Sequence, residues 1–124
     1  MSIWTLVNAQ VRIDHFGDCI KSEIEKELGE ISTFEEPCCT IIPKGSEGSL
    51  EYTIIDHKDE HCLDRYIVSV YGNLRDYNHE REIRDWFNNF LKKFDIRQAV
   101  LQINIQDDTY IYVWSDSEER LLIR

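Results

Sequence analysis

The sequence predicts an α+β fold of the ferredoxin-like type: a two-layer sandwich in which two helices cover one face of an antiparallel sheet, with an extra β-hairpin. Several segments alternate apolar and polar residues with a period of two, which is typical of half-buried strands. Two other segments repeat apolar residues every three to four positions, which is typical of amphipathic helices. With 124 residues in total, we expect a single domain over residues 1–124.

The first two expected elements are a strand and a helix. Residues 3–13 alternate, and one face carries the apolar side chains of Ile3, Val7, Ala9, Val11 and Ile13. From Asp18 onward the apolar residues recur at helical spacing, at Ile20, Ile24, Leu28 and Ile31. Asp14 or Asp18 is suited to cap the first turn of this helix, and Gly29 is suited to end it in a left-handed conformation.

The middle of the chain predicts three further strands. Residues 38–43 and 50–56 flank a turn-rich spacer at 44–49, which is a hairpin signal. A polar loop at 57–64 then precedes another strand at 65–72.

The second helix has the clearest pattern in the sequence. Its apolar residues follow the full amphipathic template at Ile83, Trp86, Phe87, Phe90, Leu91 and Phe94. Asn78 suits the N-cap position, Glu80 and Glu82 suit the first turn, and Lys92 and Lys93 suit the negative end of the helix dipole.

The end of the chain predicts a second hairpin. Residues 98–106 and 109–114 alternate on either side of Asp107 and Asp108, which is the spacing of a two-residue turn. The tail could add a short strand at 121–123. The expected order of elements is therefore β-α-β-β-β-α-β-β.

The charge of the chain limits its partners. It has 24 acidic and 14 basic side chains, a net charge of −10, so it repels phosphate backbones and anionic lipid headgroups. No segment approaches the run of about 18 apolar residues that a membrane helix needs, and the start does not resemble a signal peptide. We expect a cytoplasmic protein of a bacterial or phage-infected cell, with reduced cysteines and no direct contact with nucleic acid or membrane.

Acidic residues are concentrated in the first half of the chain. Residues 1–62 have thirteen acidic and five basic side chains, and most of this excess lies in and around the first helix. Like charges at helical spacing repel one another and cost stability, so a sequence optimised only for folding would intersperse more lysine. We expect an acidic face that binds a basic surface on a partner protein; the alternative is an ordinary solubilising face. The residues of this face are Glu23, Glu27, Glu30, Glu35 and Glu36.

Aromatic residues predict a second binding surface. Two helices can cover only one face of the sheet, and tyrosine and tryptophan on the other face would be suited to protein contacts or to a homodimer. The alternative is that the extra hairpin folds over these residues and buries them. The candidates are Trp4, Tyr71, Tyr110, Tyr112 and Trp114.

Two residue sets could support chemistry. A zinc ion could be held by four ligands, His57, His61, Cys62 and Cys38 (or its neighbour Cys39), but their spacing matches no standard zinc motif, and a solvated loop is the alternative.

A nucleophilic thiol could come from Cys19 with His15 one turn earlier, although Cys19 also borders the apolar stripe of the helix. No other catalytic motif occurs. We therefore expect no enzymatic activity and no cofactor.

Three segments resemble small uncharacterised proteins from phages and mobile elements of Gram-positive bacteria: residues 68–77, 85–87 and 96–99. The resemblance covers residues 66 to 103 and carries no known catalytic residues. It implies a protein that acts by binding a host protein, such as an anti-CRISPR or other anti-defence inhibitor that imitates nucleic acid. The alternatives are an immunity protein against a cationic toxin and a metal- or thiol-dependent enzyme of unknown reaction.

Overall fold

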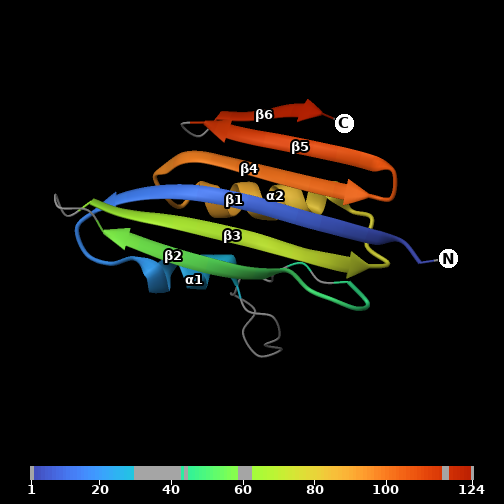
Figure 1. Cartoon of the computed structure of the whole chain (residues 1–124), viewed down its shortest axis with the longest axis horizontal. Coiled ribbons are helices and arrows are strands. Elements are labelled where there is room, and N and C mark those ends of the chain that lie inside the picture. Colours follow the sequence, from blue (N-terminus) through green and yellow to red (C-terminus); the bar gives the residue numbers. More distant parts are fainter. Residues whose placement is uncertain (1, 30–42, 44, 59–62, 116–117, 124) are drawn as a thin grey trace.

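A computed structural model describes residues 2–29, 43, 45–58, 63–115 and 118–123, with the backbone alone at 58 and 118–123. It contains one six-stranded sheet of order β2-β3-β1-β4-β5-β6, in which every neighbouring pair is antiparallel (Figure 1). The elements in chain order are β1 (Trp4–Phe16), α1 (Lys21–Leu28), β2 (Glu51–Lys58), β3 (Leu63–Arg75), α2 (Glu80–Leu91), β4 (Ile96–Ile105), β5 (Asp108–Ser115) and β6 (Glu118–Ile123).

The α+β class predicted from the sequence is confirmed. The short strand that the tail could add is present as β6. The strand expected at 38–43 lies, apart from Pro43, outside the described residues, so its pairing with residues 50–56 stays a prediction. No helix among the described residues is long and apolar enough to cross a membrane.

The central strands are longer than their hydrophobic pattern predicted. β1 and β3 pair without interruption from Trp4 opposite Arg75 to Phe16 opposite Leu63. The predicted polar loop at 57–64 is correspondingly wrong at both ends, because β2 continues to Lys58 and β3 begins at Leu63. Backbone pairing between neighbouring strands satisfies hydrogen-bonding groups regardless of side-chain polarity, so polar residues can extend a strand.

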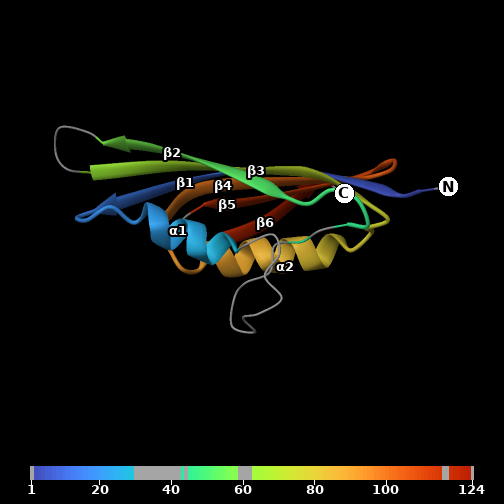
Figure 2. The ribbon, with the colours of Figure 1, turned by 90° about the horizontal axis from the view of Figure 1, so that it is seen from below.

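Both helices lie on the same side of the sheet, as Figure 2 shows, and their apolar faces are buried against it. From α1 the buried side chains are Ile24 and Leu28. From α2 they are Ile83, Trp86, Phe87, Phe90 and Leu91, as the amphipathic pattern predicted. The sheet contributes the inward residues of its strands, among them Val7, Ala9, Val11, Ile13, Tyr66, Val68, Leu101, Ile103, Tyr112 and Trp114.

The predicted N-caps are wrong for both helices. Ile20 and His79 occupy the cap positions, and no side chain caps either helix. Instead of capping α1, Asp14 forms ion pairs with Arg12 and with Arg97, at 3.2 Å and 3.5 Å. Asp14 lies within the extended β1, so its carboxylate is directed to strand neighbours rather than to the helix start.

Five described residues have a positive φ angle, and two of them, Gly29 and Gln106, lie where the sequence predicted a helix end and a turn. Gly29 ends α1 with φ 95° and ψ 171°, so its φ is positive as expected, but its ψ is extended rather than left-handed helical. The β4–β5 turn consists of Gln106 and Asp107, not Asp107 and Asp108, because Asp108 already pairs with Ile105. Gln106 takes φ 53°, a conformation in which glycine is the least strained residue.

Candidate functional site: the open sheet face and the acidic helix

The sheet has one face that the helices leave uncovered, which we call the open face. It consists of the residues of β1–β5 that alternate with the buried core residues. All the large hydrophobic side chains that the described part of the chain exposes lie on it, between 40% and 71% exposed. They are Trp4, Leu6 and Phe16 on β1, Ile55 on β2, Tyr71 on β3 and Val100 on β4.

A shallow hollow of about 330 Å³ lies near the middle of the open face. It spans four neighbouring strands, and its lining includes Gln10, Arg12, Ile67, Gln98, Val100 and Val113. The β1–β4 pairing shifts register between Arg12 and Ile13, which locally disrupts the ladder beside the hollow. Arg12 is the one ionisable residue of this lining, and its guanidinium contacts Asp14. The hollow therefore suits an apolar or amide-bearing group.

The aromatic residues predicted for this face divide into two groups. Trp4 and Tyr71 lie on the open face as predicted. The prediction is wrong for Tyr110, Tyr112 and Trp114, which lie on the face that the helices cover.

The position of α2 explains this correction. The ring of Trp114 packs 5.3 Å from the ring of Phe87, and its indole N–H donates to Oδ1 of Asn88. The hydroxyl of Tyr112 donates to Glu80, at the start of α2. The last hairpin thus does not fold over these side chains, because it continues the sheet and α2 covers it.

The acidic face can be followed only in part. Glu23 is exposed and Glu27 is half-buried on α1, whereas Glu30, Glu35 and Glu36 lie outside the described residues. Among the described residues neither of the two has an ion-pair partner. The arginines pair with other carboxylates: Arg12 and Arg97 with Asp14, Arg75 with Glu47 and Asp76, and Arg84 with Asp85.

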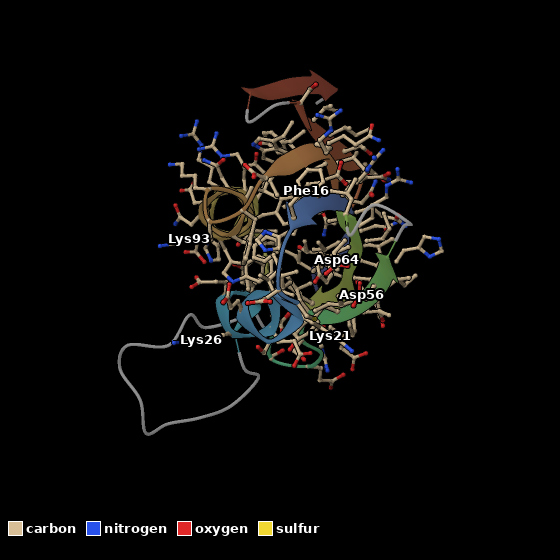
Figure 3. All side chains as sticks on the ribbon, turned by 90° about the vertical axis from the view of Figure 1, so that its left-hand side faces the viewer. Phe16, Lys21, Lys26, Asp56, Asp64 and Lys93 are labelled. Atoms are coloured by element: carbon tan, nitrogen blue, oxygen red, sulfur yellow. The ribbon has the colours of Figure 1, made fainter. Side chains whose placement is uncertain are left out.

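One end of the acidic face approaches positive charge. Glu23 lines a second hollow of about 330 Å³ together with Lys92 and Lys93, which follow α2. Its lining also includes His15, from β1, and Asp95. Figure 3 shows Lys93 beside α2 and Lys21 and Lys26 beside α1, at the helix side of the sheet. The lysines offset part of the negative potential at this end of α1.

The predicted metal ligands are not brought together in the described part of the chain. His57 is exposed on β2, opposite Arg65, and Cys38, His61 and Cys62 lie outside the described residues. No group of three or more histidine, cysteine or acidic side chains that could hold a metal ion occurs among the residues with described positions.

The predicted thiol pair is also not formed by any described contact. Cys19 is exposed, and its Sγ lies 3.9 Å from Oδ2 of Asp56. His15 lines the second hollow instead.

A buried polar cluster that the sequence did not reveal connects β3 to the start of α1. The hydroxyl of Tyr66 donates to Oδ2 of Asp64 and accepts from the backbone N–H of Ile20, both at 3.0 Å. Burial, together with contacts to Cys19 and Asp64, raises the pKa of the Tyr66 hydroxyl above its usual value. Figure 3 shows Asp64 on the inner side of the sheet. The cluster holds α1 against the sheet.

No family model, curated protein or solved structure matches this chain. The functional argument therefore depends on the surfaces themselves. The described residues present two of them on opposite sides of the molecule: an apolar, amide-rich sheet face and an acidic helix. Both are suited to binding.

Proposed function

We propose that this chain is a small, non-enzymatic interaction protein that binds and blocks a basic, nucleic-acid-binding site on a partner protein. The observation that carries the proposal is the set of carboxylates on α1. Glu23, Glu25 and Glu27 project from one short helix, and within the described structure none of them is neutralised by an ion pair.

The physical argument is one of charge complementarity. A net charge of −10 attracts a positively charged groove over distances of about one Debye length, roughly 10 Å at 0.1 M salt. Such steering accelerates encounter, and carboxylates at helical spacing can occupy positions that phosphates would otherwise take. A carboxylate that pairs with an arginine of its own chain would have to give up that pair in order to bind the partner. The carboxylates of α1 have no such pair to give up.

The class of partner follows from the same chemistry. A protein that has evolved a groove for nucleic acid offers the required density of lysine and arginine, so the proposed role is an anti-defence inhibitor, for example of a CRISPR nuclease, encoded by a phage or mobile element. The proposed location is the cytoplasm of the bacterial host. An immunity protein would instead bind a cationic toxin, and the identity of the captured partner separates the two.

The ferredoxin-like arrangement belongs to the same proposal. It is supported by the strand order β2-β3-β1-β4, with one helix following β1 and the other following β3. Strands β5 and β6 then extend this unit at the β4 edge. This arrangement would leave the outer surface of α1 available to a partner.

The test is competition with nucleic acid. A labelled guide RNA is bound to a purified CRISPR nuclease, and displacement by the protein is measured at two salt concentrations. The wild-type protein is expected to displace the RNA, less effectively at high salt. The double variant Glu23→Lys/Glu27→Lys should need roughly tenfold more protein or more.

The matched control reverses the same number of charges elsewhere. Asp107→Lys/Asp108→Lys changes two exposed carboxylates at the β4–β5 turn, which lies toward the opposite end of the sheet from α1 (Figure 1). It should compete within about threefold of wild type. Equal loss in both double variants would show a dependence on net charge alone, and no loss in the α1 variant would reject the proposed surface.

A further inference from the structure

The open face has the composition of a protein–protein interface. The exposed large hydrophobic side chains of the described chain gather there and not on the helix side. Between them lie uncharged polar residues, including Asn8, Gln10, Ser69 and Gln102. Enrichment of tyrosine and tryptophan with few charges at the centre is typical of protein–protein interfaces.

The charges on this face are balanced, whereas the whole chain is strongly negative. Its four arginines are Arg12, Arg65, Arg75 and Arg97, and the carboxylates beside them are Asp14, Glu51, and Glu47 and Asp76, which pair with Arg75. Arg65, Arg75, Arg97 and Glu51 lie near strand ends or on the edge strand β2, and Arg12 pairs with Asp14 beside the hollow, so the positions around Asn8 are uncharged. In a protein of net charge −10, this is the surface through which two identical chains repel each other least.

The area of the face matches a stable interface. Strands lie about 4.8 Å apart and rise about 3.3 Å per residue, so each outward side chain covers about 32 Å². About two dozen outward positions on β1–β5 then cover about 750 Å², close to the roughly 800 Å² per partner of a standard protein–protein interface.

We infer that two copies of this chain pack their open faces together to form a two-fold symmetric dimer. This inference goes beyond the proposed function and uses a different surface. α1 and α2 lie on the opposite side of the sheet (Figure 2), so the acidic helix α1 of each copy stays accessible in the dimer. The two sheets stack with strand directions within about 30° of each other, as in β-sandwiches.

The face also contains a self-complementary pair of features. Leu6 and Tyr71 are exposed diagonal neighbours on β1 and β3, and we call this pair the ridge. The hollow lined by Gln10 and Val100 begins about 13 Å further along β1. Consider a two-fold axis that lies in the plane between the two sheets, runs perpendicular to the strands and passes near Asn8. This axis places the ridge of each copy over the hollow of the other. An isologous interface requires this reciprocity.

The test measures mass in solution. Sedimentation velocity of the full chain over about 1 to 100 µM should show a monomer–dimer equilibrium. Leu6→Arg changes the ridge, and Val100→Arg changes the rim of the hollow. Each should weaken dimerisation roughly tenfold or more, because a charge is then buried against the other copy. Both side chains are exposed in the single chain, so circular dichroism and the melting temperature of the monomer should not change.

The matched control is Asn89→Arg, at an exposed position of α2 on the opposite side of the sheet, which should dimerise within about threefold of wild type. Higher salt should strengthen the dimer, because it screens the repulsion between two acidic chains. A wild-type protein that stays monomeric at about 100 µM, or dimers that tolerate both arginines, would overturn the inference.

The two proposals can fail separately. Leu6→Arg should still compete with nucleic acid for the basic partner, and Glu23→Lys/Glu27→Lys should still dimerise. Dimers without competition would reject only the proposed function. If the protein stays strictly monomeric but still competes with nucleic acid, only the dimer is rejected. The same holds if its open face binds a different partner.

Discussion

Individual buried polar residues connect the helices to the sheet more specifically than hydrophobic contact alone. Tyr66 is fully buried, and its hydroxyl joins a backbone N–H at the start of α1 to the carboxylate of Asp64 on the same strand. Tyr77 is similarly placed before α2 and donates to Glu82. Hydrophobic contacts are non-directional, whereas these hydrogen bonds set the position of each helix start.

Removing one hydroxyl tests this role. Tyr66→Phe withdraws the acceptor of the Ile20 N–H and one donor to Asp64, and should lower the free energy of unfolding by about 1–3 kcal/mol in a urea titration. The control is Tyr71→Phe, which removes an exposed hydroxyl that contacts Thr53, and should change stability by less than about 0.5 kcal/mol. Equal effects of the two substitutions would show that the buried cluster adds nothing to the free energy of unfolding.

The same tyrosines predict a stability loss at alkaline pH. Burial, reinforced for Tyr77 by Glu82, raises the pKa of both hydroxyls above the ordinary 10.0. The folded state therefore retains protons that the unfolded state releases, so stability is complete below pH 10 and falls as the pH rises beyond it. Urea titrations above pH 10 should show this decline in the free energy of unfolding, and the decline should be smaller in Tyr66→Phe and Tyr77→Phe. If both variants lose stability with pH as steeply as the wild type, the prediction is wrong.

At the scale of elements, α2 decides which side chains of the last hairpin are buried. β5 is apolar on both of its faces, with Tyr110, Tyr112 and Trp114 on one and Ile111 and Val113 on the other. Its sequence pattern therefore cannot show which face is covered. In the structure the strand pairs with β4, and the faces of the two strands are aligned, so α2 covers the aromatic face.

Two phenylalanines provide a matched test of this packing. Phe87→Ala removes a fully buried ring between α2 and Trp114, and should lower the free energy of unfolding by about 3–5 kcal/mol. Phe16→Ala makes the same chemical change at a ring that is 71% exposed, and should cost less than about 0.5 kcal/mol. Chemical denaturation of both variants measures the difference, and similar losses would show that α2 does not pack as described.

For the whole molecule, the separation of surfaces matters most. The acidic helix lies on one side of the sheet and the charge-poor open face on the other (Figure 2). The two proposed associations, with a basic partner and with a second copy, therefore use opposite sides of the sheet and should respond to salt in opposite directions.

Net charge also predicts how the single chain responds to salt. Self-repulsion at a net charge of −10 destabilises the compact state, and screening reduces this repulsion. The melting temperature of the monomeric Leu6→Arg variant should rise by a few degrees from low to moderate sodium chloride. A melting temperature that is constant or falls would show that the ion pairs, such as Arg75 with Glu47 at 2.5 Å, dominate instead.

The local elements and the overall charge of the chain could be predicted from the sequence alone. Periodicity identified β1 and α2 and their buried residues, because each of these patterns depends on neighbours within a single element. Composition determined the acidic character of the chain, and the alternation of Trp4 and Tyr71 with core residues predicted their exposure.

Which residues share a surface depends on how the elements pack and could not be predicted from the sequence. The burial of Tyr112 and Trp114, the length of β3, and the gathering of Leu6, Tyr71 and Val100 on one face depend on strand order and register. The contact between Tyr66 and the start of α1 joins residues that are 46 positions apart. Such long-range contacts form when elements pack together, so no pattern within one element can reveal them.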